Sequence, residues 1–187
     1  MNAWKHFKTI TYHKWLVCKG CFAVGLFRQG LLHDLSKYSP TEFLIGVKYY
    51  QGDRSPNNAE REERGFSSAW LHHKGRNKHH YEYWIDYSMH GGIGGMRPAP
   101  MPRRYIAEMV MDRIAACKVY LGDKYTDKSP LEYYLTGKDP APMHPFTRKC
   151  LEHLLKMLAE KGEKKTFAYI KNVFLQSHSA NVGNKIQ

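Results

Sequence analysis

Residues 31–37 decide the fold and read Leu31-Leu32-His33-Asp34-Leu35-Ser36-Lys37. Two ionisable side chains, His33 and Asp34, stand here inside an apolar run. Burying an adjacent imidazole and carboxylate costs free energy unless each is paired or bound to a metal. The pattern therefore predicts a short, mostly buried helical turn whose two polar residues serve chemistry. We call these two residues the His-Asp dyad.

Further histidines occur on both sides of the dyad. The chain holds eleven histidines, and six of them fall at positions that could converge on one metal site: His13, His33, His72, His73, His79 and His80. An interval of seven residues separates each member of the first pair from its counterpart in the second, close to two helical turns, so one member of each pair could share a helix face. Asp112 adds a carboxylate within a later helical pattern. Imidazole with carboxylate favours Mn, Fe, Ni, Co or Zn over Mg or Ca.

The hydrophobic pattern predicts an all-α fold. Apolar residues recur at helical spacing, and no alternating strand pattern is convincing. Helices are predicted over residues 4–27, 40–50, 103–121, 129–136, 146–161 and 164–175, with a loop over 91–102. The tetrad Ser39-Pro40-Thr41-Glu42 is typical of a capping box with proline at the first helical position. One helical-bundle domain is expected over residues 1–175, followed by a polar, frayed tail over 176–187.

Charge and cysteine content indicate the kind of ligand and the cellular location. Lys and Arg number 29 against 17 Asp and Glu, which gives a formal charge of +12 and favours anionic ligands. Four cysteines are too few for a disulfide scaffold and no signal-peptide pattern opens the chain, so a cytoplasmic location is predicted. The apolar stretch over residues 15–27 is too short to cross a bilayer, and no membrane partner is expected.

The order of a single histidine, the dyad, further histidines and a distant helical aspartate resembles the HD-domain superfamily of metal-dependent phosphohydrolases. The resemblance spans His13 to Asp112. It is closest to an uncharacterised bacterial and phage family associated with that superfamily. The shared motifs are His33-Asp34-Leu35-Ser36-Lys37, Ala69-Trp70-Leu71-His72-His73, Asn77-Lys78-His79-His80 with Trp84, and Glu108-Met109-Val110 with Asp112.

The resemblance implies a helical domain with a specific set of ligands. One metal would be bound by His13, His33, Asp34 and Asp112. Asp34 would bridge to a second metal held by His73 and His80, with His72 and His79 as alternates. Glu108, one turn before Asp112, is an alternative ligand or a residue that orients one.

The phosphate side of the site should be basic. Lys37 lies three residues after Asp34, and Arg76 lies among the histidines, so both are predicted to contact an anion. His33, Asp34, Lys37 and Arg76 are therefore the candidate catalytic residues.

The resemblance, together with the positive charge, implies a metal-dependent phosphohydrolase that acts on a nucleotide or another small phosphorylated compound and uses one or two metal ions. The surplus of histidines keeps an HD-like di-iron oxygenase as an alternative. The positive charge and thirteen tyrosines keep a non-catalytic nucleic-acid-binding module as a second one. The helical spacing of the aromatic residues predicts that they belong to the core, which weighs against nucleic acid. The sequence predicts no oligomeric state.

Overall fold

The structure is a computed structural model, and it describes residues 2–89, 91, 94–137 and 142–177. Its α-helices, in chain order, are α1 Asn2–Ala23, α2 Phe27–Leu32, α3 Pro40–Lys48, α4 Pro56–Arg64, α5 Ser68–Lys74, α6 Arg103–Leu121, α7 Ser129–Thr136 and α8 Pro145–Tyr169. Shorter helical segments are η1 Leu35–Tyr38, η2 Tyr81–Trp84, η3 Gly122–Lys124 and η4 Ile170–Phe174. The all-α prediction is confirmed. The predicted tail falls almost wholly outside the described residues.

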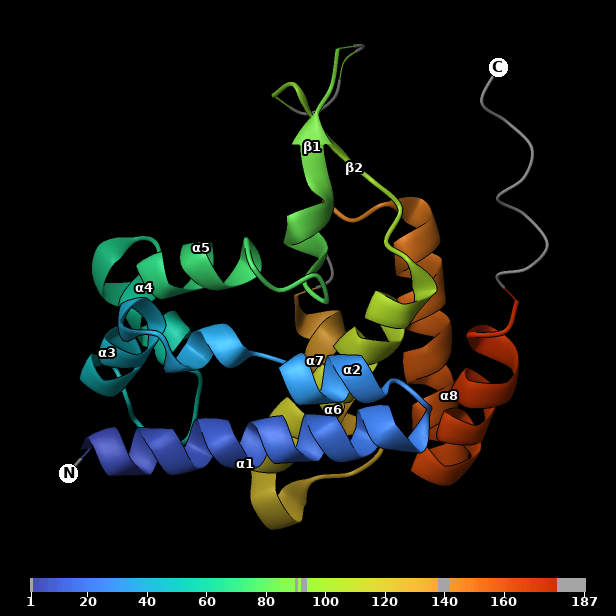
Figure 1. The fold of residues 1–187 in the computed structure, drawn as a ribbon, viewed down its shortest axis with the longest axis horizontal. Coiled ribbons are helices and arrows are strands. Elements are labelled where there is room, and N and C mark those ends of the chain that lie inside the picture. The colour runs from blue at the N-terminus through green and yellow to red at the C-terminus, as the bar shows by residue number, and fades with distance from the viewer. Residues whose placement is uncertain (1, 90, 92–93, 138–141, 178–187) are drawn as a thin grey trace.

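Within the described residues, the β-structure consists of one small hairpin. Strands β1 Ile85–Tyr87 and β2 Met96–Pro98 pair antiparallel, with Ile85 opposite Pro98 and Tyr87 opposite Met96. The hairpin projects from the helical body (Figure 1). The glycine and proline content of residues 91–102 predicts a loop, and β2 corrects that prediction in part. A strand of three residues is too short to display a readable alternation in the sequence.

The first predicted helix is two helices. The helix expected over residues 4–27 ends at Ala23, because Gly25 has a φ of +85° and the chain turns before α2 starts at Phe27. Helix α1 lies along α6 (Figure 1). A Cβ at Gly20 would lie 2.7 Å from the Sδ atom of Met111, so glycine is what permits this close approach.

The hydrophobic core lies where α1, α6 and α8 meet. Its fully buried members include Val17 of α1, Ile106 of α6, and Leu151 and Leu154 of α8. Helix α8 is interrupted at Gly162, whose φ of +77° confirms the predicted break there. The shorter helices α3, α4 and α5 pack together on the other side of the molecule (Figure 1).

The aromatic residues of α1 are not in the core, and this corrects the prediction. Trp4, Trp15 and Phe22 expose 63%, 51% and 41% of their surface, and the Nζ atom of Lys19 lies 4.4 Å from the Trp15 ring centre. The opposite face of α1, which carries Val17, packs on α6. Helical spacing identifies a stripe of apolar residues, but it does not say which stripe faces the core.

Helix α3 begins at Pro40 as predicted, but the capping box does not form. The Ser39 side chain makes no capping hydrogen bond, and the Glu42 carboxylate turns instead toward His72 and His73. Among the described residues, no helix is long and apolar enough to span a membrane, and all four cysteines are free.

Candidate metal centre

The backbone at the dyad is strained in a way that aims both side chains inward. Helix α2 ends at Leu32, and His33 adopts a φ of −52° and a ψ of 128°. Asp34 then takes a left-handed conformation, with a φ of 53° and a ψ of 27°. It is the only non-glycine residue of positive φ in the described part of the chain. Such a conformation costs of the order of 1 kcal/mol and tends to persist where function requires it. His33 and Asp34 are 2% and 1% exposed.

A first set of four residues includes the dyad and comes from three parts of the chain. It consists of His13 of α1, His33, Asp34 and Asp112 of α6. The Nε2 atom of His13 lies 2.9 Å from Oδ1 of Asp112 and 3.8 Å from Oδ2 of Asp34. The Nε2 atom of His33 lies 3.2 Å from the same Asp34 oxygen and 3.5 Å from the same Asp112 oxygen. These four residues are the first predicted ligand set.

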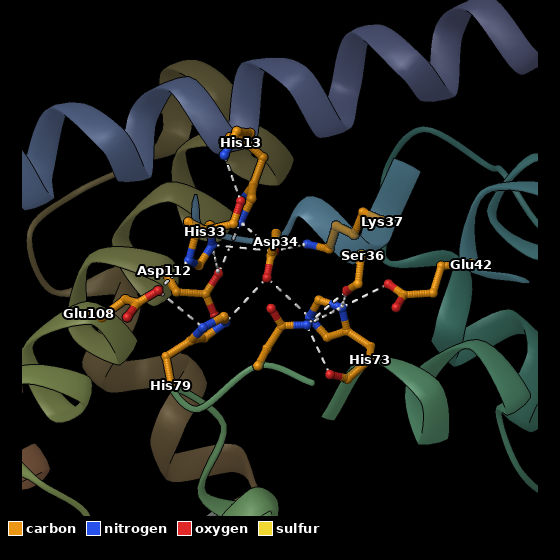
Figure 2. A network of polar contacts seen from close by, with 12 residues as sticks. His13, His33, Asp34, Ser36, Lys37, Glu42, His73, His79, Glu108 and Asp112 are labelled. Atoms are coloured by element: carbon orange, nitrogen blue, oxygen red, sulfur yellow. Dashed lines mark hydrogen bonds and ion pairs between the residues drawn. The ribbon is translucent and has the colours of Figure 1, made fainter. Parts of the chain in front are cut away.

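A second set of four shares Asp34. It consists of Asp34, His73 at the end of α5, and His79 and His80 in the turn that follows. The Nε2 atoms of His73 and His79 lie 3.3 and 3.4 Å from Oδ1 of Asp34 (Figure 2). In each of the two sets, the ligand atoms lie within 4.8 Å of one another. His79, predicted only as an alternate, therefore joins His80 in this set.

Asp34 connects the two sets through its two oxygens. Its Oδ2 atom faces His13 and His33, and its Oδ1 atom faces His73 and His79. One carboxylate thus presents one oxygen to each group of imidazoles. This is the arrangement needed for a carboxylate that bridges two cations.

Two glutamates fix the orientation of the histidines. The Nδ1 group of His33 donates to Oε1 of Glu108 at 2.9 Å, and Nδ1 of His79 lies 3.3 Å from the same oxygen. The Nδ1 group of His73 donates to Oε2 of Glu42 at 2.8 Å. A proton on Nδ1 leaves the lone pair of a neutral imidazole on Nε2, which here points at Asp34. A carboxylate behind each imidazole is the usual support of a metal ligand.

The residues present fit a bound metal. Four buried atoms make no hydrogen bond among the described residues: the Nε2 atoms of His33, His79 and His80 and the Oδ1 atom of Asp34. Buried polar atoms in folded proteins nearly always have a partner. Lone pairs that face a carboxylate need a cation between them, either an added proton or a metal. The mixture of imidazole and carboxylate donors suits a divalent transition metal.

The charges around Asp34 show how the site is balanced without a metal. Burial alone would raise the pKa of Asp34, but the charges of His33 and Lys37 hold it well below its usual range. Burial would lower the pKa of His33, but Asp34 and its other acidic neighbours raise it well above the ordinary value. Burial lowers the pKa of His80, and the neighbouring His79 lowers it further. The acidic neighbours of His33 therefore favour the positively charged form of its imidazole.

Lys37 completes the site, whereas Arg76 and His72 lie outside it. The Nζ atom of Lys37 lies 2.6 Å from Oδ2 of Asp34 (Figure 2). Arg76 is exposed and donates to the backbone oxygen of His72, so the structure does not support a catalytic role for it. His72 belongs to neither ligand set and bonds to Glu42 through Nδ1 at 2.6 Å. Helix α5 turns His73 inward and leaves its neighbour His72 partly exposed.

Glu42 is the contact that sequence reasoning missed. Its position in a Ser-Pro-Thr-Glu tetrad predicted a helix cap, and nothing local indicated that its carboxylate binds His73. Glu108 had two predicted roles, ligand or orienting residue. Its oxygen also lies near both His33 and His79 as a third potential metal-binding group. Because that oxygen contacts their Nδ1 atoms and not the Nε2 atoms that face Asp34, the orienting role fits better.

A cavity opens beside the two sets. It has a volume of about 670 Å³, and its lining includes His13, Lys37, His80 and Asp112. Aromatic residues such as Tyr120 form part of its wall. A cavity of this size fits a small molecule, and it reaches the atoms that would hold the metal.

Fold and site together define an all-helical protein with buried histidine and aspartate clusters that could hold a metal ion. Residues 2–157 match DUF5662, a family of unknown function, and the chain belongs to this family. The matched range includes every residue of both ligand sets. Neither the curated proteins nor the solved structures contain a match to the chain.

Proposed function

We propose that this protein is a metal-dependent phosphohydrolase that acts on a nucleotide or another small phosphorylated compound. The proposal rests on one observation: the carboxylate of Asp34 presents one oxygen to each of two groups of buried imidazoles. The resemblance of the dyad and its surrounding histidines to the HD-domain superfamily supports the same reaction. The formal charge of +12 favours an anionic substrate.

The two sets would divide the ligands between two ions. His13, His33 and Asp112 would hold one, His73, His79 and His80 the other, and Asp34 would contact both. When bound, divalent ions supply positive charge that polarises phosphoryl oxygens and lower the pKa of a water toward ~7.

The protein's own groups would orient the substrate. In hydrolysis a water oxygen forms a bond to phosphorus while the bond to the leaving oxygen breaks, and negative charge gathers on the phosphoryl oxygens. Lys37 lines the cavity beside Asp34 and would offset part of that charge. The cavity would hold the rest of the substrate and limit the access of water.

Metal content and turnover test the proposal together. Purified protein should contain one or two equivalents of Mn, Fe, Ni, Co or Zn by elemental analysis. Reconstituted protein should release phosphate from a panel of phosphoesters and nucleotides. His33→Ala and Asp34→Ala should lose the metal and the activity, while His153→Ala, an exposed histidine of α8, should keep both. Metal-loaded protein that hydrolyses no phosphoester would refute the proposal.

A di-iron oxygenase is the second candidate. It is favoured by the three histidines that accompany Asp34 in the second set, since a second ion then has a nitrogen-rich site of its own. Iron at two equivalents, a mixed-valent spectroscopic signature and oxygen uptake would select it. A protein that is active with zinc alone would exclude it.

A further inference from the structure

The cavity carries a cation that the metal centre does not use. Three basic side chains line it: Lys37, Arg54 and Arg113. Lys37 pairs with Asp34, and Arg54 donates to both carboxylate oxygens of Glu62 at 2.6 and 2.7 Å. For Arg113 the described residues supply no ion pair. Of these three side chains, Arg113 is therefore the one whose charge has no carboxylate partner among the described residues.

Arg113 lines the cavity together with members of the two ligand sets but belongs to neither set. It follows Asp112 on α6, and because successive helical residues are rotated by about 100°, the two side chains leave the helix in different directions. The guanidinium carbon lies 5.5 Å from the centre of the Tyr134 ring, which supports it from one side. Glu82 and Glu132 line the same cavity, and burial raises the pKa of Glu82 while the positive charge of Arg113 lowers it in part.

The Nε atom of Arg113 lacks an acceptor. It is buried and makes no hydrogen bond within the part of the chain that the structure describes. A buried donor without an acceptor is rare in folded proteins, because losing water without gaining a partner costs free energy. A guanidinium group presents several donors in one plane, which matches the paired oxygens of a phosphate or carboxylate. The ligand is the natural source of the missing acceptor.

We propose that Arg113 binds an anionic group of the substrate, a phosphate or a carboxylate, at a second position in the cavity. This position is separate from the one where the scissile group meets the metal ligands and Lys37. The inference rests on the proposed function in that the same cavity would hold the substrate. It narrows the substrate class to phosphorylated compounds that carry a second anionic group.

Binding to metal-free protein tests Arg113 without any need for turnover. Phosphorus NMR would follow inorganic phosphate at about 1–20 mM, the range of a weak single-site complex, in the presence of a chelator. Wild type and Arg104→Gln should bind phosphate equally, since Arg104 is an exposed arginine of the same helix. Arg113→Gln should bind about 10- to 100-fold more weakly. Equal binding by Arg113→Gln, or no binding by wild type, would overturn the proposal.

Two further variants separate a lost contact from a lost fold. Arg113→Lys keeps the charge and should recover part of the binding, and Arg113→Met keeps an apolar stem beside Tyr134 while removing all donors. Circular dichroism shows whether each variant is folded. A folded Arg113→Met that binds phosphate as tightly as wild type, or a folded Arg113→Lys that recovers no binding, would overturn the proposal.

Kinetics then connect the residue to substrate choice. For a phosphoester with a second anionic group, Arg113→Gln should raise KM about 10- to 100-fold, while KM for p-nitrophenyl phosphate stays unchanged. Equal effects on both substrates would overturn the assignment. If no ester is hydrolysed but phosphate binding still depends on Arg113, the phosphohydrolase proposal fails and the anion position stands.

Discussion

Replacing Glu108 should weaken both metal positions at once, because a single oxygen of this residue supports a histidine in each set. Oε1 accepts from Nδ1 of His33 at 2.9 Å and lies 3.3 Å from Nδ1 of His79. His33 belongs to the first set and His79 to the second. In Glu108→Gln the charge is gone and the side chain keeps one acceptor oxygen, while its NH₂ group repels any N–H that faces it.

The expected loss of metal affinity follows from the effect of comparable substitutions in other metal sites. Loss of a residue that orients a metal-bound histidine usually lowers metal affinity about 10- to 100-fold, or about 1.4–2.7 kcal/mol. Glu108→Gln should cost this much at both positions. Glu42→Gln provides a matched comparison, because Glu42 supports His73 of the second set, and its other partners, His72 and Ser36, belong to neither set. It should weaken one position only.

The assay is a titration of metal-free protein with cobalt or zinc against a competing chelator, which yields the number of ions bound and the affinity of each. Thermal unfolding of the metal-free variants checks that each one is folded. Wild-type affinity for two ions in Glu108→Gln would refute this reasoning. So would an equal loss at both positions in Glu42→Gln.

Three stability predictions concern packing and protonation. In Gly46→Ala the new Cβ would clash with Nε2 of His6, so the free energy of unfolding should fall by about 1–3 kcal/mol and Tm by about 2–4 °C per kcal/mol. The control is Gly137→Ala, whose Cβ would meet no described atom within 4 Å, and equal Tm values for the two variants would contradict the prediction. Burial lowers the pKa of the His6 imidazole to about 4 in the folded protein. Between pH 6.5 and about 4 this imidazole is protonated only in the unfolded chain, so the free energy of unfolding should fall as the pH is lowered through that window. In urea denaturation of the metal-free protein, the free energy of unfolding of His6→Leu should depend less on pH than that of wild type. The same pH dependence in both proteins would argue against this role of His6. Gly162→Ala places a Cβ at a φ of +77° and 3.0 Å from Oδ2 of Asp127, which should cost about 1–2 kcal/mol by the same assay; no loss would count against the strain.

Part of the site was predictable because its signal is local. His33 and Asp34 stand next to each other in an apolar run, and their burial is costly without a partner, so the sequence alone marks them as functional. The helical period indicates an all-α fold, and Pro40 and Gly162 mark helix boundaries that the structure confirms.

Other residues were misjudged because their roles depend on distant neighbours. Glu42 has the spacing of a helix cap, yet its carboxylate binds the imidazoles of α5. Trp15 has helical spacing, yet it faces outward. Arg76 lies between the two histidine pairs in sequence, but its side chain points away from the ligand sets.

The sequence by itself determined that this chain is helical and that a buried histidine and aspartate need a partner, because periodicity and the cost of burial act between residues close in the chain. Only the tertiary structure decided that His73, His79 and His80 join Asp34 while His72 does not. That choice depends on how α5 and the turn after it lie against α3 and α6. The packing of helices that are far apart in sequence sets those orientations, and no short stretch of residues encodes them.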